Sequence, residues 1–365
     1  MYDVIVIGGG PAGTSAAITC VRRGASVLLL ERGRFPRHRV CGEFVSAESL
    51  DLLGDLLAPQ HAQLFSAAIR IPQSRIFLDG RTLHTTVAPA AAGISRFDLD
   101  AALWDSAQDR GVDCRQEASA QSLSGGGPFL VKTSVGVFES RALINASGRW
   151  SNLTSAFSEV ADSKPKWIGL KGHFVETSAG ASVDLYFFDG GYCGVQPVDH
   201  AGGVEGSGRV NACAMVRADV ATTLPEVFVR HPQLQERSRT WKPLSDPVKT
   251  SPLVFREPQP ERDGILMVGD AAAFVDPFVG DGISLALRSG RMAGDSLLPF
   301  FAGTISLPDA ARNYQATYEE HLGAIFRTSS TIRRMLRLPQ SVRAPILRLL
   351  EKSPAITRYM VSKTR

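Results

Sequence analysis

The sequence predicts an α/β protein with a three-layer ββα domain, an inserted domain built on an antiparallel sheet, and a C-terminal helical tail. Three observations predict this fold. Residues 3–31 run from an apolar strand through a glycine-rich turn and a helix to a second strand. Apolar and polar residues alternate over 167–175, 182–188 and 209–216, which favours a sheet with one covered face. Residues 321–365 are basic, with apolar residues at helical spacing.

The N-terminal segment has the pattern of a dinucleotide-binding turn. Val4–Ile7 is a β-branched run suited to a buried parallel strand. Gly8 permits a tight turn, Gly10 lets a pyrophosphate approach the backbone, and Gly13 lets helix and strand pack closely. Glu31 ends the next strand, where a carboxylate can accept hydrogen bonds from ribose hydroxyls. This context favours a Rossmann-like domain over a fortuitous glycine-rich turn. The expected contacts are Gly8, Gly10, Pro11, Ala12, Gly13, Glu31 and Arg32.

A second pattern lies far along the chain, beginning at Gly264. It predicts a buried strand over Ile265–Val268, an acidic turn at Asp270, and a loop that opens a helix at about Gly282. Asp270 is placed to bind a polyol such as a ribityl chain. Gly280 and Gly282 would leave backbone amides facing an anion, which in a flavoenzyme is the N1–C2=O edge of the reduced ring. The alternative is an ordinary strand–loop–helix with a capping aspartate.

Taken in order, these stretches resemble the FAD-dependent oxidoreductases that include aromatic hydroxylases of the p-hydroxybenzoate hydroxylase type and the geranylgeranyl reductases. The stretches are the glycine turn with Glu31, Arg39-Val-Cys-Gly-Glu, Ser95-Arg-Phe-Asp-Leu-Asp-Ala-Ala-Leu, and Gly269-Asp270 with Pro277-x-x-Gly-x-Gly. The resemblance implies FAD as cofactor. It places Glu31 on the adenosine ribose and Arg39, Arg96 and Asp270 near the ribityl or pyrophosphate groups. It also places Gly280, Gly282 and Ile283 near the flavin ring.

Details favour the geranylgeranyl-reductase branch. Cys41-Gly42-Glu43 resembles that branch's loop beside the flavin, and the helix from Ile283 resembles its helix after the flavin loop. Gly191–Pro197 lies where that branch has Tyr-x-Trp-x-Phe-Pro, but Gly194 and Gln196 replace the Trp and Phe. The expected cavity is therefore larger and more polar, which argues against an isoprenoid substrate. The chain has no Trp-x-Trp-x-Ile-Pro stretch, so a flavin halogenase is not expected.

The electron donor is not indicated by a motif. Hydroxylases of this group have an Asp-Gly motif that serves FAD and NADPH, and Ser147 stands where the Asp would be. The chain has no second G-x-G-x-x-G, so no separate NADPH domain is expected. NAD(P)H, a protein electron donor and the substrate itself stay open as sources of electrons.

Three side chains are candidates for chemistry beside the flavin. Cys41 would gate substrate or donate a proton, or else be an inert buried thiol. Tyr192 and His173 lie on predicted cavity strands, where they would position a phenol or carbonyl or simply be satisfied core residues. Glu43 is a further candidate acid, with a solvated loop carboxylate as its alternative.

The predicted FAD-binding domain is discontinuous, because the two flavin patterns lie at opposite ends of a long insertion. It comprises 1–68, 94–155 and 256–310, the substrate-binding domain comprises 69–93 and 158–254, and 311–365 forms the basic helical region.

Charge is unevenly distributed along the chain. Residues 321–365 hold ten basic residues and one acidic residue, a net +9, so the preceding 320 residues carry −5 of the chain's net +4. Apolar residues recur here at Ile332, Met335 and Leu336, then at Ile346, Leu349 and Leu350. Such a tail predicts a peripheral contact with a membrane or another anionic partner. The alternative is a helical cap whose apolar stripe packs on the flavin domain.

Composition limits the remaining classes. The five cysteines are odd in number and lack Cys-x-x-Cys spacing, which argues against disulfides and zinc, and we expect no metal site. No basic n-region or long apolar run precedes the first strand, so we expect a cytoplasmic protein, with membrane association left open through the tail. We expect no nucleic-acid partner.

These observations predict an FAD-dependent oxidoreductase acting on a hydrophobic small molecule. Hydroxylation of an aromatic or polyketide-like compound and reduction of an isoprenoid-type C=C bond are both open. A flavin-binding electron carrier or scaffold without its own substrate is the alternative from another class, and an NAD dehydrogenase is a further one.

Overall fold

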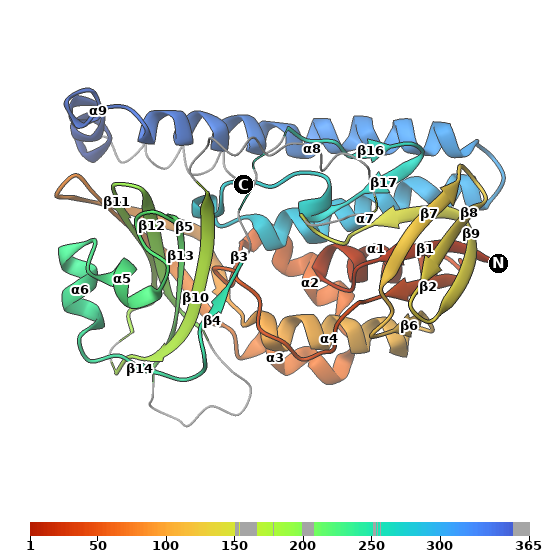
Figure 1. The fold of residues 1–365 in the computed structure, drawn as a ribbon, viewed down its shortest axis with the longest axis horizontal. Helices are drawn as coiled ribbons and strands as arrows, with labels where there is room; N and C mark the ends of the chain where they lie inside the picture. Colours follow the sequence, from red (N-terminus) through yellow and green to blue (C-terminus); the bar gives the residue numbers. More distant parts are fainter. Residues whose placement is uncertain are drawn as a thin grey trace.

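The computed structural model describes residues 1–149, 153, 166–177, 179–198, 208–250, 253, 255 and 257–352, without the side chains of 346 and 349–352. Two sheets lie side by side along the long axis, and the helix α8 (Leu307–Leu336) runs across both of them (Figure 1). The predicted α/β fold class with a helical C-terminal region is confirmed. The predicted domain boundaries at 155, 158 and 254 fall on residues outside the description.

The first sheet is built around the N-terminal strand. β1 (Tyr2–Ile7) pairs in parallel with β2 (Val27–Leu30) on one side and with β9 (Gly136–Asn145) on the other. Its last four residues are buried, as expected for a strand covered on both faces. The remaining strands are β6 (Asp113–Arg115), β7 (Ala120–Gly125), β8 (Phe129–Thr133), β16 (Glu261–Arg262) and β17 (Ile265–Met267).

A tight hairpin turn precedes β9. β8 pairs antiparallel with β9, and Thr133 lies opposite Gly136, so the turn falls at Ser134-Val135. The strands β7, β8 and β9 form one antiparallel part of this sheet, and β16 with β17 forms another. The strands β7 and β8 supply the second β layer of the predicted ββα arrangement.

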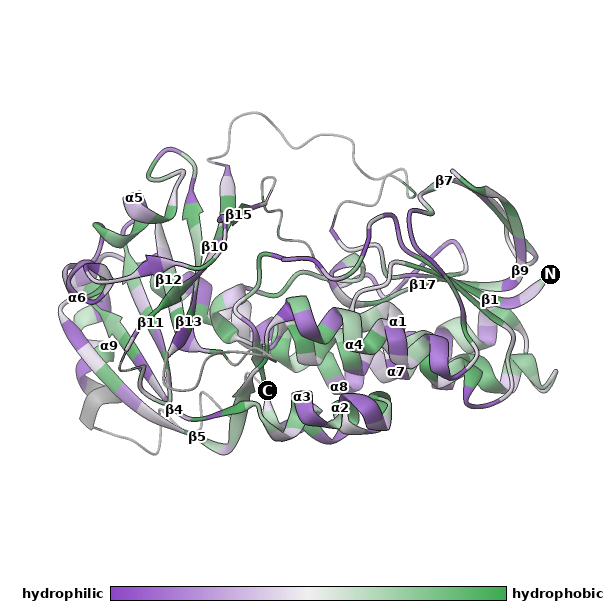
Figure 2. Ribbon diagram, turned by 90° about the horizontal axis from the view of Figure 1, so that it is seen from below, coloured by the Kyte–Doolittle hydropathy of each residue, from purple (hydrophilic) through white to green (hydrophobic). Residues whose placement is uncertain are grey.

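Helices α1 (Pro11–Val21), α4 (Arg96–Asp109) and α7 (Gly282–Phe301) form the helical layer, grouped beside the first sheet and away from the second (Figure 2). α1 and α7 approach closely because Gly290 has no side chain: a Cβ there would overlap the carbonyl oxygen of Ala12. The short helices are α2 (Leu50–Leu56), α3 (Ala62–Ser66), α5 (Leu224–Phe228) and α6 (Pro232–Ser238).

The second sheet takes strands from two separate stretches of chain. The strands predicted at 167–175 and 182–188 are confirmed at those bounds as β10 and β11. The full set is β3 (Phe44–Val45), β4 (Ile69–Leu78), β5 (Arg81–Gly93), β10 (Trp167–Val175), β11 (Ser182–Phe188), β12 (Gly191–Pro197), β13 (Arg209–Arg217), β14 (Lys242–Pro243) and β15 (Val248–Lys249).

Two expectations about this sheet were wrong. It is not wholly antiparallel, because β11 pairs in parallel with β4. Nor is only one face covered: β10 is buried on both faces, since α5 and α6 contribute Leu224, Phe228 and Leu234 to a core on one side of the sheet. Alternating polarity failed here because residues such as Lys171 and His173 are polar yet buried.

The C-terminal helices connect the two sheets. α8 begins at a capping box formed by Ser306 and Asp309, and its Tyr314 hydroxyl donates to the carbonyl oxygen of Met267 at 2.7 Å. At the other end of α8, its last residue, Leu336, packs with Leu78 and Leu83 of the second sheet. Leu347 of the next helix, α9 (Gln340–Lys352), packs in the same cluster.

The alternative that the tail packs its apolar residues on the flavin domain holds for Leu322, Ile325 and Phe326, which belong to the core around the first sheet. It is wrong for Leu336 and Leu347, which pack on the second sheet. Ile346, Leu349 and Leu350 lie outside the described side chains, as do residues 353–365 altogether. Arg334 and Arg337 are exposed, and contact with an anionic partner stays a prediction. In the described part of the chain, no helix has the length and apolar character needed to cross a bilayer.

Candidate active site

A crevice of about 390 Å³ lies between the two sheets, a volume within the range of small-molecule sites. It brings together both of the predicted flavin patterns. Of the predicted site residues, those in its wall are Gly8, Gly10, Pro11, Ala12, Glu31, Arg32, Arg39, Cys41, Arg96, Tyr192, Asp270, Gly280, Gly282 and Ile283. Gly13 and His173 are not in the wall.

The glycine turn has the backbone geometry that its spacing predicts. Gly8 has a φ of 111°, and a Cβ on it would overlap the carbonyl oxygen of Ala146. A Cβ on Gly13 would overlap the carbonyl oxygen of Gly8, so this glycine serves helix–strand packing. Gly10 differs, because the nearest atom to its Cβ would be the Arg96 guanidinium at 3.9 Å. The open side of Gly10 leaves the first turn of α1 free to receive an anion.

The crevice wall has both basic and acidic side chains, the acidic ones being Glu31, Glu43, Asp100 and Asp270. Five arginines contribute to its wall: Arg32, Arg37, Arg39, Arg96 and Arg149. Burial lowers the pKa of Arg39 to about 10, which leaves it cationic at neutral pH. Arg96 donates to Asp100 in a two-pronged pair with both distances at 2.6 Å. These cations suit a pyrophosphate.

Glu31 already accepts several hydrogen bonds from the protein, which the sequence did not suggest. Its carboxylate accepts from the backbone N–H groups of Gly9 and Gly33 at 3.0 and 2.8 Å, and from the Arg37 guanidinium at 2.8 Å. Burial opposes ionisation, but the Arg37 contacts outweigh it and lower the pKa of Glu31. A carboxylate has about four acceptor sites, so a ribose hydroxyl would compete with Arg37 for this group.

Asp270 lies at the opposite side of the crevice, after β17. Its carboxylate is 3.8 Å from the Arg149 guanidinium, and its side chain is 41% exposed. Ser147, which replaces the hydroxylases' Asp, donates from both its N–H and its hydroxyl to Asn145 Oδ1. NAD(P)H, a protein donor and the substrate itself stay the alternatives for the source of electrons.

The loop that follows Cys41 is anchored by a buried ionic cluster. Glu43 has a φ of 61° and no exposed surface. Its carboxylate pairs with the Lys171 ammonium, lies 2.6 Å from His173 Nε2, and accepts from the Arg96 backbone N–H at 2.8 Å. Burial opposes ionisation, yet Lys171 and His173 together lower the pKa of Glu43 to about 2. The interpretation of Glu43 as a solvated carboxylate was wrong.

His173 therefore contacts Glu43, and it lines neither the crevice nor the second cavity described below. Its role toward a substrate stays a prediction. Sequence reasoning missed Lys171, although a lysine within an apolar strand pattern needs a buried partner. Cys41 lines the crevice and its Sγ accepts from the Glu43 backbone N–H at 3.3 Å. Its carbonyl oxygen accepts from Asn211 Nδ2 at 2.9 Å.

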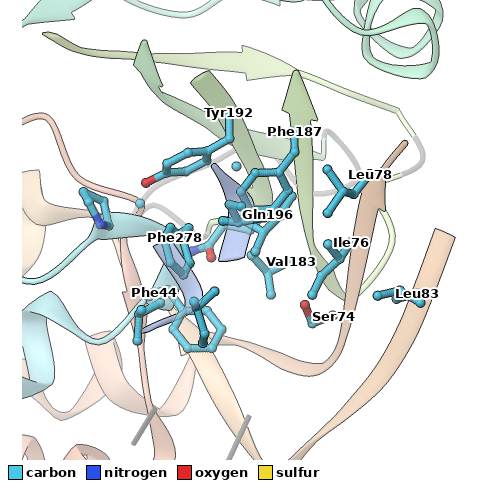
Figure 3. A pocket seen from close by; sticks show the side chains of 18 of the residues that line it. Phe44, Ser74, Ile76, Leu78, Leu83, Val183, Phe187, Tyr192, Gln196 and Phe278 are labelled. Atoms are coloured by element: carbon cyan, nitrogen blue, oxygen red, sulfur yellow. The ribbon is translucent and has the colours of Figure 1, made fainter. Parts of the chain in front are cut away.

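A second cavity, of about 190 Å³, adjoins the crevice and is mainly apolar (Figure 3). Phe187 and Tyr192 lie together at one end, with ring centroids 5.4 Å apart, and Ile76, Leu78 and Leu83 lie at the other. The end of α8 closes it with Ile332, Met335 and Leu336. Six residues line both cavities: Gly42, Phe44, Tyr192, Cys213, Pro277 and Gly280.

Two buried aspartates flank the loop that both cavities share. Burial raises the pKa of Asp276 to about 7, against the opposing charge of Arg333, whose Nε is 3.9 Å away. Burial also raises the pKa of Asp281 to about 6, although Ser46 donates to it at 2.8 Å. Sequence reasoning missed both residues, because nothing local marks an aspartate in a glycine-rich loop as buried.

Comparison with known proteins identifies the family. One family model described as FAD dependent oxidoreductase matches residues 38–295, and another with the same description matches residues 3–36. The chain belongs to the FAD dependent oxidoreductase family. Its cofactor is FAD, and the crevice fits that molecule, since an open glycine turn and five arginines meet its pyrophosphate requirement.

Relatives of this FAD dependent oxidoreductase include reductases and a halogenase. It is 27% identical to a digeranylgeranylglycerophospholipid reductase 2 of Methanopyrus kandleri, covering 89% of the chain and 84% of the relative. It is 26% identical to a tryptophan 2-halogenase of Chondromyces crocatus, and the match covers 87% of this chain and 65% of the halogenase.

Solved structures agree on the fold. A geranylgeranyl bacteriochlorophyll reductase-like protein from Thermoplasma acidophilum has a TM-score of 0.75 at 20% identity, covering all of this chain and 95% of that one. A myxobacterial chondrochloren halogenase has a TM-score of 0.74 at 20% identity, and the match covers 89% of this chain and 81% of that one. These structures support the fold of the FAD dependent oxidoreductase and do not distinguish its reaction.

Replacing Asp270 with alanine is expected to weaken FAD binding by about tenfold or more without unfolding the protein. The carboxylate is a charged acceptor facing the crevice, and removing a half-exposed side chain costs little stability. FAD retained after gel filtration would be measured from visible absorbance against protein. Asp295→Ala, an exposed carboxylate on α7, is the matched control. Full FAD retention by Asp270→Ala would contradict the role given to Asp270.

Proposed function

We propose that this enzyme reduces a C=C bond in a hydrophobic small molecule. The observation that supports this function is the apolar cavity that shares six wall residues with the FAD crevice. A molecule enclosed there would lie against the loop Pro277–Gly280, next to the cofactor. The reductases among the relatives support the same reaction type. An electron carrier without a substrate would have no use for such an apolar cavity beside its cofactor.

FAD, when bound and reduced, supplies the hydride. The protein's own residues bind the cofactor phosphates, exclude water from the cavity and hold a proton for the second carbon. Tyr192 and Cys213 lie in the shared wall. Burial raises the pKa of Tyr192 and of Cys213 well above their usual ranges, so both keep their protons at neutral pH. We assign the proton to the Tyr192 hydroxyl, because a phenol forms stronger hydrogen bonds than a thiol.

Hydroxylation of an aromatic compound is the second candidate function. It is favoured by the four aromatic rings in the cavity wall, those of Phe44, Phe187, Tyr192 and Phe278. Rings of this kind can stack on or meet the edge of an aromatic substrate. The reaction differs from reduction in needing dioxygen as a co-substrate.

The two reactions are separated by what the product gains. Photoreduced holoprotein would be mixed under argon, and then in ¹⁸O₂, with geranylgeranyl glycerophospholipids, enones and phenols, and the products analysed by mass spectrometry. Reduction predicts a gain of two hydrogen atoms without oxygen, and loss of most of this activity in Tyr192→Phe. Incorporation of ¹⁸O would instead support hydroxylation. Transfer of bromide or chloride from the buffer would overturn both functions.

A further inference from the structure

Gln196 is a buried amide in the wall of the apolar cavity (Figure 3). It lies on β12 and is 3% exposed. Its Nε2 has no hydrogen-bond partner among the residues that the structure describes. Leaving a buried donor unpaired is costly, so a ligand atom that accepts from Nε2 gains binding energy that a hydrocarbon cannot.

Among the described residues, neighbouring polar side chains give Gln196 Nε2 no hydrogen bond, although the paired Asn211 also has a buried, unpaired acceptor, its Oδ1. Gln196 pairs with Asn211 on β13, and Asn211 pairs with His173 on β10, so three polar residues form a row across the sheet. His173 is committed to Glu43, and Asn211 Nδ2 is committed to the carbonyl oxygen of Cys41. Gln196 comes next in the row after Asn211, and it lines the apolar cavity.

Beyond Gln196 the row continues across β11 and β4, with an apolar residue, Val183, and then a polar one, Ser74. Asp184 pairs with Val195, which puts Val183 beside Gln196, and Val183 pairs with Ser74 on β4. Figure 3 shows Val183 between Gln196 and Ser74, with Phe187, Ile76 and Leu83 around them. Polar side chains in the cavity wall are therefore few: Ser74 and Gln196 lie in this row, and Tyr192 and Cys213 lie outside it.

We propose that the cavity binds a compact hydrophobic molecule bearing a carbonyl oxygen, and that Gln196 Nε2 donates a hydrogen bond to that oxygen. This inference rests on the proposed function, whose substrate class it narrows. The cavity of about 190 Å³ is smaller than sites for drug-sized ligands, which favours a compact molecule over a long prenyl lipid. A single well-placed polar group in an apolar site fixes a ligand's orientation and selects for its partner.

The test compares two ligands of the same shape. Binding of benzylideneacetone to the holoprotein would be measured by calorimetry beside the hydrocarbon in which CH₂ replaces the carbonyl oxygen. We expect the ketone to bind about tenfold more tightly to the wild-type protein. Gln196→Met keeps the length of the side chain and removes the donor, so it should abolish this preference. The control Gln235→Met changes an exposed residue on α6 and should keep it.

Equal binding of the two ligands to the wild-type protein, or binding of neither, would overturn the inference. So would a preference for the ketone that survives in Gln196→Met, with FAD content and melting temperature showing that the variant is folded. Turnover in the same preparations separates this inference from the proposed function. A reduced prenyl lipid without any ketone preference would leave the function standing, whereas ketone-selective binding without C=C reduction would leave only the inference.

Discussion

Glu43→Gln is expected to lower the free energy of unfolding by about 3–5 kcal/mol, because it leaves the Lys171 ammonium buried without its counter-charge. Urea denaturation of the holoprotein would measure the change. The double variant Glu43→Gln with Lys171→Met removes both charges and should recover much of the loss.

Glu117 provides a matched control for this variant. It has nearly the same left-handed backbone, with a φ of 58°, but its carboxylate pairs with Arg34 at the surface, where both side chains are more than half exposed. Glu117→Gln should therefore change stability by less than about 1 kcal/mol. A Glu43→Gln protein as stable as this control would show that the cluster does not hold the loop.

The same cluster predicts an acid-sensitive stability. The pKa of Glu43 is lowered to about 2 in the folded protein, against an ordinary value near 4.5. Its contribution is thus fully present above pH about 4.5 and is lost as the pH falls toward 2. Stability measured across that window should fall more steeply for the wild-type protein than for Glu43→Gln.

Gly13→Ala is expected to destabilise the protein by about 3 kcal/mol and to abolish FAD retention. The new Cβ would overlap the carbonyl oxygen of Gly8, so α1 must move away from β1 and the turn that receives the phosphates is lost. Melting temperature of the apoprotein and the FAD-to-protein absorbance ratio would measure the two effects.

Two other glycines separate folding from cofactor binding. Gly54→Ala on α2 meets nothing within 4 Å and should leave both quantities unchanged or raise stability slightly. Gly10→Ala has room in the protein, with its nearest neighbour at 3.9 Å, but puts a methyl group in front of the α1 amides. It should keep the apoprotein's melting temperature and lose FAD. An unchanged FAD content in Gly10→Ala would contradict phosphate binding at this turn.

The sequence alone determined the features that depend on neighbouring residues. The turn at Gly8 and the bounds of β10 and β11 follow from local sterics and side-chain patterns, which a short window displays. The same patterns did not reveal that β10 is buried on both faces. The turn's motif and the Gly269-Asp270 pattern also indicated the cofactor correctly.

Only the tertiary structure decided which distant residues meet. Glu43 and Lys171 are separated by 128 positions. The sequence left Glu43 as a candidate acid or a solvated carboxylate, and it marked nothing at Lys171. The end of α8 closes the cavity of the second sheet, and Gln196 faces that cavity without a partner among the described residues. Burial and pairing of this kind follow from how the two sheets and α8 pack against one another. Local periodicity contains no information about that packing, because it describes only one element at a time.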